Sequence, residues 1–238
     1  MRACFIIIIM LLCALQHATG QSNIKDSVDI AFLLGKTNYA NDKRFTKLPM
    51  GISSKENAYL LNEVTDSLMK MIAAAKKDGI QFQVISASRN FDQQKNIWEK
   101  KWLARKTQYP GGLDRAKNIL LYSSMPGTSR HHWGTDFDLN SLNPKYFAQG
   151  KGKKEYDWLC MNAARYGFYQ PYDANPNRTG YKEEKWHWSF FPIGDQLTQN
   201  YLEQIKYEDL GPFSGSNYSK EINVIQQYVN GIQNPPHP

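Results

Sequence analysis

Cysteine is scarce in this chain of 238 residues, which contains only three, at positions 4, 13 and 160. The first two lie within residues 1–20, a segment with the pattern of a secretory signal. Removal of that segment leaves Cys160 alone, and an exported chain with one cysteine has no internal disulfide. The fold must therefore be held together by packing, and about 218 residues suffice for one large domain with a substantial core.

Long apolar runs are also lacking outside residues 1–20. In that segment Arg2 supplies a positive charge, residues 5–15 an apolar stretch and residues 18–20 the small side chains of a cleavage site. The apolar stretch is too short to cross a bilayer comfortably, so we expect no stable membrane span and a secreted or periplasmic protein. A lipoprotein anchor at Cys13 is the weaker alternative, because leucines precede it where such sites have a small residue.

Acidic residues are outnumbered, since 29 lysines and arginines against 22 aspartates and glutamates give a formal charge of +7. Loss of Arg2 with the signal lowers this to +6. The excess favours contact with an anionic polymer such as the cell wall, although a solvated surface would carry the same charge. No basic run is interleaved with aromatic residues, so we expect no nucleic-acid partner, and we expect a monomer.

Histidine is rare too, with five residues. His17 lies in the signal segment, and His237 lies in a proline-rich tail, residues 233–238, that we predict to be disordered. The histidines left for a buried site are His131, His132 and His187.

Residues 126–140 hold the densest group of metal-binding side chains. Ser129, His131, Gly134 and Asp138 form the spacing S-x-H-x-x-G-x-x-x-D. A catalytic zinc has three protein ligands and an open fourth position, and we interpret His131 and Asp138 as two of the three. Gly134 allows a sharp turn, and the strand that follows alternates carboxylates with apolar side chains.

The third ligand must come from another part of the chain. His187 is favoured over His132, because it lies in a β-prone aromatic segment with a carboxylate, Glu184, three residues before it. Glu184 is then within reach of a water on the metal, whereas Glu183 is interpreted as a solvated carboxylate.

The segments SRHHWGTDFD at 129–138 and EKWHW at 184–188 together resemble the VanY-type zinc D-alanyl-D-alanine carboxypeptidases, whose pattern is S-x-H-x-x-G-x-A-x-D followed by E-x-W-H. The resemblance runs roughly from residue 55 to 192. It implies one zinc ion per chain and Glu184 as catalytic base. The implied zinc ligands are His131, Asp138 and His187.

A further family segment, S-x-x-R-x-x-x-x-Q, is similar to the stretch that contains Ser86, Arg89 and Gln94. In relatives this arginine binds the substrate and stabilises the charge that develops on it during the reaction. The resemblance implies the same role for Arg89 and places Gln94 next to the substrate. We expect Ser129 to hydrogen-bond the substrate and Trp186 to form a wall of the site.

The sequence departs from the family pattern at two positions. Asp136 replaces a small alanine and adds a carboxylate to the metal-facing side of the strand, where it would change the charge of the site or orient a ligand. Lys185 replaces a proline, but the spacing from Glu184 to His187 is unchanged.

The periodicity and the resemblance together imply an α+β fold: a small, mainly antiparallel sheet that carries the zinc site, with helices packed around it. We expect an N-terminal arm over residues 21–52 and a zinc peptidase domain over residues 53–232, with Cys160 buried. Helices are predicted from a Ser53–Glu56 capping box to residue 78, and over 91–106, 113–121, 153–166, 196–208 and 219–230. Strands are predicted over 80–84, 135–139 and 186–190.

The function implied is removal of the terminal D-alanine from peptidoglycan stem peptides that end in D-Ala-D-Ala. An endopeptidase on the same zinc scaffold and a non-catalytic zinc-containing protein that binds the cell wall are the alternatives. Arg89 weakly favours the carboxypeptidase over the endopeptidase, because a terminal carboxylate needs a cationic partner. Glu184 argues against the non-catalytic protein, because a structural zinc has little use for a base.

Overall fold

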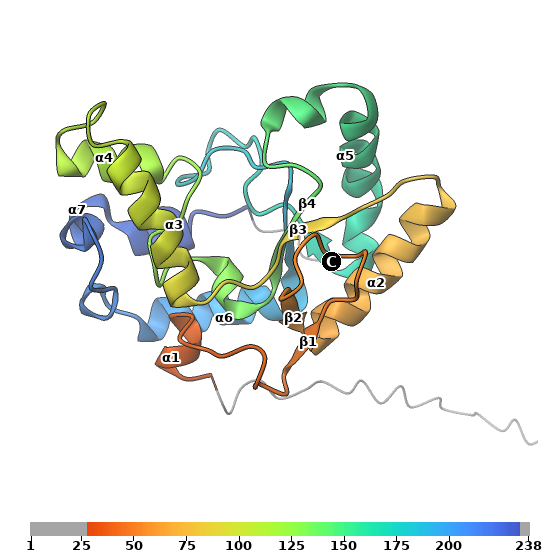
Figure 1. Cartoon of the computed structure of the whole chain (residues 1–238), viewed down its shortest axis with the longest axis horizontal. Helices are drawn as coiled ribbons and strands as arrows, with labels where there is room; N and C mark the ends of the chain where they lie inside the picture. The colour runs from red at the N-terminus through yellow and green to blue at the C-terminus, as the bar shows by residue number, and fades with distance from the viewer. Residues whose placement is uncertain (1–27, 234–238) are drawn as a thin grey trace, which may run out of the picture.

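A four-stranded antiparallel sheet lies at the centre of the computed structural model, which describes residues 28–233 (Figure 1). The predicted signal peptide and the last five residues lie outside the described part. The strand order is β3-β4-β6-β5. The strands are β3 (Val84–Ser86), β4 (Asp136–Leu139), β5 (Phe168–Tyr169) and β6 (His187–Phe190). The sheet with helices around it confirms the predicted α+β class.

Helices flank this sheet on both sides. In Figure 1, α2 and α5 lie on one side of β3 and β4, α3 and α4 lie on the other, and α6 runs below. The helices are α1 (Ile30–Leu33), α2 (Asn62–Lys77), α3 (Phe91–Ala104), α4 (Gly112–Ile119), α5 (Gly150–Asn162), α6 (Phe191–Gln204) and α7 (Ser219–Ile222). Short 3-10 turns are η2 (Arg130–Trp133), η3 (Pro144–Ala148), η4 (Ala163–Tyr166), η5 (Tyr207–Asp209) and η6 (Ser216–Tyr218), and Ile225–Val229 is a π turn, η7.

The predicted start of α2 is wrong. The helix begins at Asn62 without a side-chain cap, and the Ser53 hydroxyl instead accepts a bond from the Lys55 N–H at 3.0 Å. The residues just before the helix form a strand, β2 (Tyr59–Leu61), which pairs with β1 (Phe45–Lys47). Pairing with a distant strand outweighs the local helical pattern here.

Other boundaries also shift. The strand predicted over residues 80–84 starts only at Val84, because pairing with β4 begins there, opposite Leu139. The helix predicted from 196 starts at Phe191, since a proline in the first turn suits a helix start. The helix predicted over 219–230 is interrupted at Asn223, whose φ is 57°.

The described part of the N-terminal arm packs into the core behind η2. Phe32 and Leu33 of α1 are buried, and the indole N–H of Trp133 donates to the carbonyl of Leu33 at 3.0 Å. The Tyr39 hydroxyl donates to the carbonyl of His132 at 3.0 Å. The arm therefore supports the back of the segment that carries His131.

Cys160 is exposed, so the expectation that it is buried is wrong. Helix α5 buries Trp158 and Leu159, and each further residue turns about 100° around the helix, which places Cys160 on the outer face. No helix within residues 28–233 combines the length and the apolar character needed to cross a membrane.

Candidate metal centre

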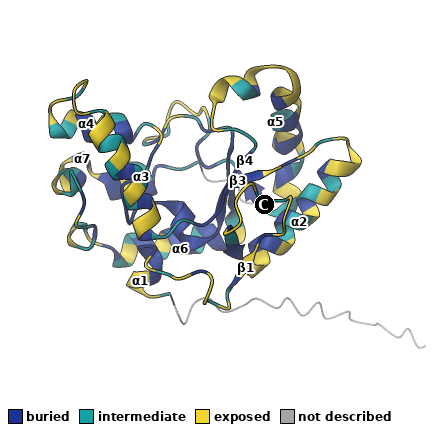
Figure 2. Cartoon of the chain, in the orientation of Figure 1, coloured by how far each residue is buried: buried dark blue, intermediate teal, exposed yellow. Residues whose placement is uncertain are grey.

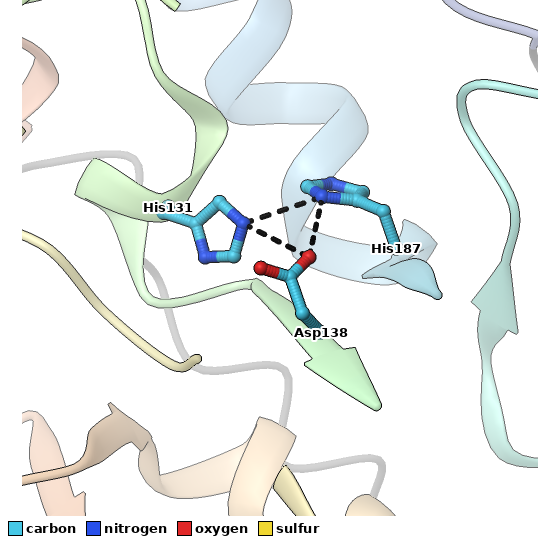
Figure 3. Close-up of side chains that lie close together, drawn as sticks. All are labelled: His131, Asp138 and His187. Atoms are coloured by element: carbon cyan, nitrogen blue, oxygen red, sulfur yellow. Dashed lines mark hydrogen bonds and ion pairs between the residues drawn. The ribbon is translucent and has the colours of Figure 1, made fainter. Parts of the chain in front are cut away.

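Figure 3 shows the side chains of His131, Asp138 and His187 directed at one another. Nε2 of His131 lies 3.2 Å from Nδ1 of His187. Oδ1 of Asp138 lies 3.1 Å from that Nδ1 and 3.5 Å from Nε2 of His131. Ligands with zinc bond lengths of about 2.0–2.2 Å at the corners of a tetrahedron are about 3.3–3.6 Å apart. The three atoms are thus spaced as ligands of one tetrahedral ion.

Strand register explains why side chains distant in the sequence meet. Asp138 on β4 lies directly opposite His187 on β6, and side chains opposite one another in a sheet are close neighbours. His131 on η2 reaches the same place because the chain turns at Gly134, whose φ is 73°. A Cβ on Gly134 would lie 2.3 Å from Cε1 of Phe45. The predicted turn is therefore present and requires glycine.

Each histidine is oriented by a hydrogen bond on the ring nitrogen that faces away from the centre. Nδ1 of His131 donates to the carbonyl of Ala87 at 2.8 Å, which leaves Nε2 available to a metal. Nε2 of His187 donates to Oδ2 of Asp136 at 2.8 Å, which leaves Nδ1 available. Such partners fix the tautomer and orientation of metal-binding histidines. The extra carboxylate therefore lies behind a ligand rather than among the ligand atoms.

Asp136 is fully buried and paired with Arg130, a residue that the sequence pattern does not single out. Nε of Arg130 donates to Oδ2 of Asp136 at 3.0 Å. The hydroxyls of Ser189 and Thr135 donate to Oδ1 at 2.8 and 2.6 Å. Burial would raise the pKa of Asp136, but the charge of Arg130 and the hydrogen bond from His187 hold it well below its usual range. The carboxylate stays ionised and keeps its acceptor atom on the histidine.

Without a metal, the centre carries a proton on His187. Burial alone would lower the pKa of His187, but its hydrogen bonds to Asp136 and Asp138 raise it to about 9. Burial lowers the pKa of His131, and the positive charge of Arg89 lowers it further. A metal ion would therefore have to displace the proton from Nδ1 of His187, because a ligand nitrogen must be unprotonated.

Glu184 lies beside the three ligand atoms. Its Oε2 is 3.8 Å from Nδ1 of His187, and its backbone N–H donates to the carbonyl of Tyr172 at 2.8 Å. Burial raises the pKa of Glu184 to about 8, against the charge of His187, which lowers it. Glu183 instead pairs with Lys185 at 3.9 Å and is about one-third exposed. The two neighbouring glutamates thus differ in environment: Glu184 is buried next to the centre, and Glu183 is partly exposed and paired with a lysine.

Arg89 follows β3 and points its guanidinium at the other side of the centre. Nη1 lies 3.7 Å from Oδ2 of Asp138 and donates to the Ser86 hydroxyl at 2.7 Å. Nε donates to Oε1 of Gln94 at 3.1 Å, and the Gln94 amide donates to the carbonyl of Ser124 at 2.8 Å. Gln94 therefore holds Arg89 in place, which the sequence alone does not indicate.

A cavity of about 380 Å³ opens onto the ligand atoms. Its walls include the remaining residues that the sequence placed at the site, which are Arg89, Gln94, Ser129, Glu184 and Trp186. The Ser129 hydroxyl is buried and has no hydrogen-bond partner within residues 28–233. Buried hydroxyls are rarely left unpaired, so this one is suited to bind a molecule in the cavity.

His132 does not belong to the ligand cluster. Its Nδ1 donates to the carbonyl of Arg89 at 2.6 Å, and its Nε2 accepts from the N–H of Gly127 at 3.1 Å. Burial lowers the pKa of His132 to about 3, so it stays neutral. The structure thus places His187, rather than His132, beside His131 and Asp138.

These features define a candidate metal centre in a VanY-like α+β scaffold. The family model for VanY, D-alanyl-D-alanine carboxypeptidase, matches residues 57–193, and the chain belongs to this family.

Two curated relatives and one solved structure show how far the similarity extends. The chain is 29% identical over 166 residues to YodJ of Bacillus subtilis (strain 168), covering 63% of this chain and 56% of that protein. It is 27% identical over 147 residues to a D-alanyl-D-alanine carboxypeptidase of Enterococcus faecalis (strain ATCC 700802 / V583), covering 61% and 53%. The chain thus matches about half the length of each.

The structure of a mutant of the vancomycin resistance D,D-pentapeptidase VanY in complex with Zn(II) shares the fold, with a TM-score of 0.52 and 23% identity. The match covers 71% of this chain and 90% of that one.

Proposed function

We propose that this chain is an exported zinc-dependent D,D-carboxypeptidase that removes the C-terminal D-alanine from peptidoglycan stem peptides. The observation that carries the proposal is the convergence of three ligand atoms, 3.1 to 3.5 Å apart, beside the buried carboxyl of Glu184. Membership of the VanY family and the names of the relatives support the substrate class.

The metal proposed is one zinc ion per chain, held by His131, Asp138 and His187. Two imidazoles and a carboxylate are typical zinc ligands, and three protein ligands leave a position open, as in catalytic sites. When bound, zinc supplies Lewis-acid polarisation and makes a water acidic enough to react near neutral pH. The metal in the related VanY structure supports this choice.

Glu184 is proposed as the general base. It accepts a proton from the water that attacks the peptide carbonyl and then delivers that proton to the departing amine. Its burial suits this task, because a carboxyl whose pKa lies near neutrality both accepts and returns a proton readily. Its position 3.8 Å from Nδ1 of His187 places it next to the ligand atoms without making it one of them.

Arg89 is proposed to pair with the terminal carboxylate of the peptide. Its side chain is 21% exposed and borders the cavity, so the guanidinium can form a bidentate pair with a carboxylate. Gln94 orients it, the unpaired hydroxyl of Ser129 donates to the peptide, and Trp186 forms an apolar wall.

The proposed enzyme is exported: residues 1–20 direct export, and the mature protein acts as a monomer in the periplasm or outside the cell, where a formal charge of +6 favours binding to anionic wall polymers. The arm over residues 21–52 precedes a peptidase domain over residues 53–232.

The test is to incubate the zinc-loaded protein with a muropeptide pentapeptide and identify products by mass. Loss of one D-alanine supports the proposal, an internal cut indicates an endopeptidase, and no product indicates a zinc-containing wall-binding protein. The Glu184→Gln variant should bind zinc but lose turnover. Glu183→Gln is the matched control and should retain activity, because Glu183 pairs with Lys185 and is not among the residues that line the cavity.

A further inference from the structure

One face of α3 forms part of the cavity wall. Gln94, Ile97 and Lys101 line the cavity, and their spacing of three and four residues places them on one side of a helix. Trp98 is fully buried, and its indole N–H donates to the carbonyl of Ser214 at 2.7 Å, which anchors the helix elsewhere. Figure 2 shows that α3 has both buried and exposed sides. The packing of the helix therefore places Lys101 at the cavity wall.

Lys101 differs from the other cations of the cavity wall because it has no carboxylate at salt-bridge distance among residues 28–233. Arg89 lies 3.7 Å from Asp138, and Arg130 lies 3.0 Å from Asp136. Lys101 is half-buried, and burial lowers its pKa, as do the positive charges of Arg105 and Arg89; Glu184 opposes this shift, but only through longer-range electrostatics. A cation that has lost part of its hydration and lacks a close counter-ion is stabilised by an anionic ligand.

The helical rise between Gln94 and Lys101 gives an approximate length for such a ligand. Gln94 holds the Arg89 guanidinium, and Lys101 follows Gln94 by seven residues, or about 10 Å along the helix axis. An extended peptide covers about 3.3–3.6 Å per residue. If the C-terminal carboxylate of a peptide binds Arg89, a group of that peptide that contacts Lys101 would belong to about the third residue from the C-terminus.

We propose that Lys101 binds a second carboxylate of the substrate, carried by the side chain of the third residue from the C-terminus. The substrates preferred would be peptides with an acidic residue at that position. This inference rests on the proposed function for the placement of the terminal carboxylate at Arg89.

Three peptides test the inference: N-acetylated tripeptides that end in D-Ala-D-Ala and begin with glutamate, glutamine or lysine. The glutamate peptide should have a kcat/KM about threefold to tenfold above that of its neutral glutamine isostere, the range expected for one partly exposed ion pair. The lysine peptide should be the poorest. Lys101→Met should bring the glutamate and glutamine peptides to equal values, and Lys101→Glu should reverse the order of the glutamate and lysine peptides.

Lys100→Met is the matched control, because Lys100 lies on the exposed side of the same helix and should keep the preference. Equal kcat/KM for glutamate and glutamine peptides in the wild type, or a preference that persists in Lys101→Met, would overturn the inference while leaving the proposed function intact. Calorimetric binding of the same peptides to Glu184→Gln separates the two claims. If no peptide is cleaved but binding still prefers glutamate through Lys101, the proposed function fails and the anion site stands.

Discussion

Replacing Asp136 with alanine restores the residue usual in the family and removes the carboxylate behind His187. Two effects follow from different contacts. Arg130 loses the partner that lies 3.0 Å from its Nε, and the His187 imidazole loses the acceptor that lies 2.8 Å from its Nε2. The first contact concerns the stability of the fold, and the second concerns the affinity for the metal.

The loss of stability and the loss of metal affinity have different magnitudes. Arg130 and Asp136 are both almost completely buried, and removing one partner of a buried pair costs about 3–5 kcal/mol because the other charge is left uncompensated. Loss of a hydrogen-bond partner behind a metal-binding histidine typically weakens metal binding by about 10–100-fold. We expect Asp136→Ala to show both losses.

Urea unfolding of the metal-free protein measures the first loss, and competition with a zinc chelator measures the second. The Arg130→Met, Asp136→Ala double variant separates them. Replacing a buried ion pair with apolar residues is often close to neutral for stability, so unfolding should return towards that of the wild type. Zinc affinity should stay low, because His187 still lacks its acceptor.

Wild-type zinc affinity in a folded Asp136→Ala protein would refute this reasoning. So would a double variant in which stability and zinc affinity recover together, because Asp136 would then act only through the fold. The double variant keeps the test decisive even if Asp136→Ala alone is too unstable to purify.

Three further outcomes are expected. Zinc binding at pH 7 should release a proton from His187, because the pKa of this residue without metal is about 9. The affinity for zinc should therefore rise about tenfold per pH unit towards pH 9. Calorimetry in buffers of different ionisation enthalpy measures the proton release, and its absence would contradict the prediction. Gly35→Ala should lower the free energy of unfolding by about 1–3 kcal/mol, because φ of Gly35 is +76° and the new Cβ would lie 2.4 Å from the His132 ring. An unchanged free energy of unfolding in urea would mean that the arm is not part of the core. Arg178→Met should expose residues 173–181 to proteolysis, because Arg178 donates to the carbonyl groups of Asp173 and Tyr181 at 3.0 and 2.6 Å. It should also lower kcat/KM, because Tyr181 lines the cavity. Protease resistance equal to that of the wild type would show that Arg178 does not hold this segment in place.

The candidate metal-binding residues could be predicted from the sequence, because residue type and the scarcity of histidine restrict the choice. Only three of the five histidines lie outside the terminal segments, and His131 and Asp138 are close together in the chain. Their meeting with His187 is confirmed. Gly134 could also be predicted, because a sharp turn between two functional side chains is a local requirement.

The supporting contacts could not be predicted in this way. The pairing of Asp136 with Arg130 and the hold of Gln94 on Arg89 depend on side-chain orientation, and the sequence pattern does not encode that directly. The capping box at Ser53 failed for a similar reason, since the segment before α2 is drawn into a strand by a partner more than ten residues away.

Residue types alone specify the chemistry available at the candidate centre: two imidazoles, a carboxylate and a nearby glutamate, spaced so that local turns and strands bring some of them together. The fold sets how far apart their atoms lie, which ring nitrogen faces inward and which cation of the cavity wall has no carboxylate at salt-bridge distance within residues 28–233. Residue type fixes what a side chain can bind. Distances between segments instead depend on strand register and helix packing, which arise from contacts across the whole domain.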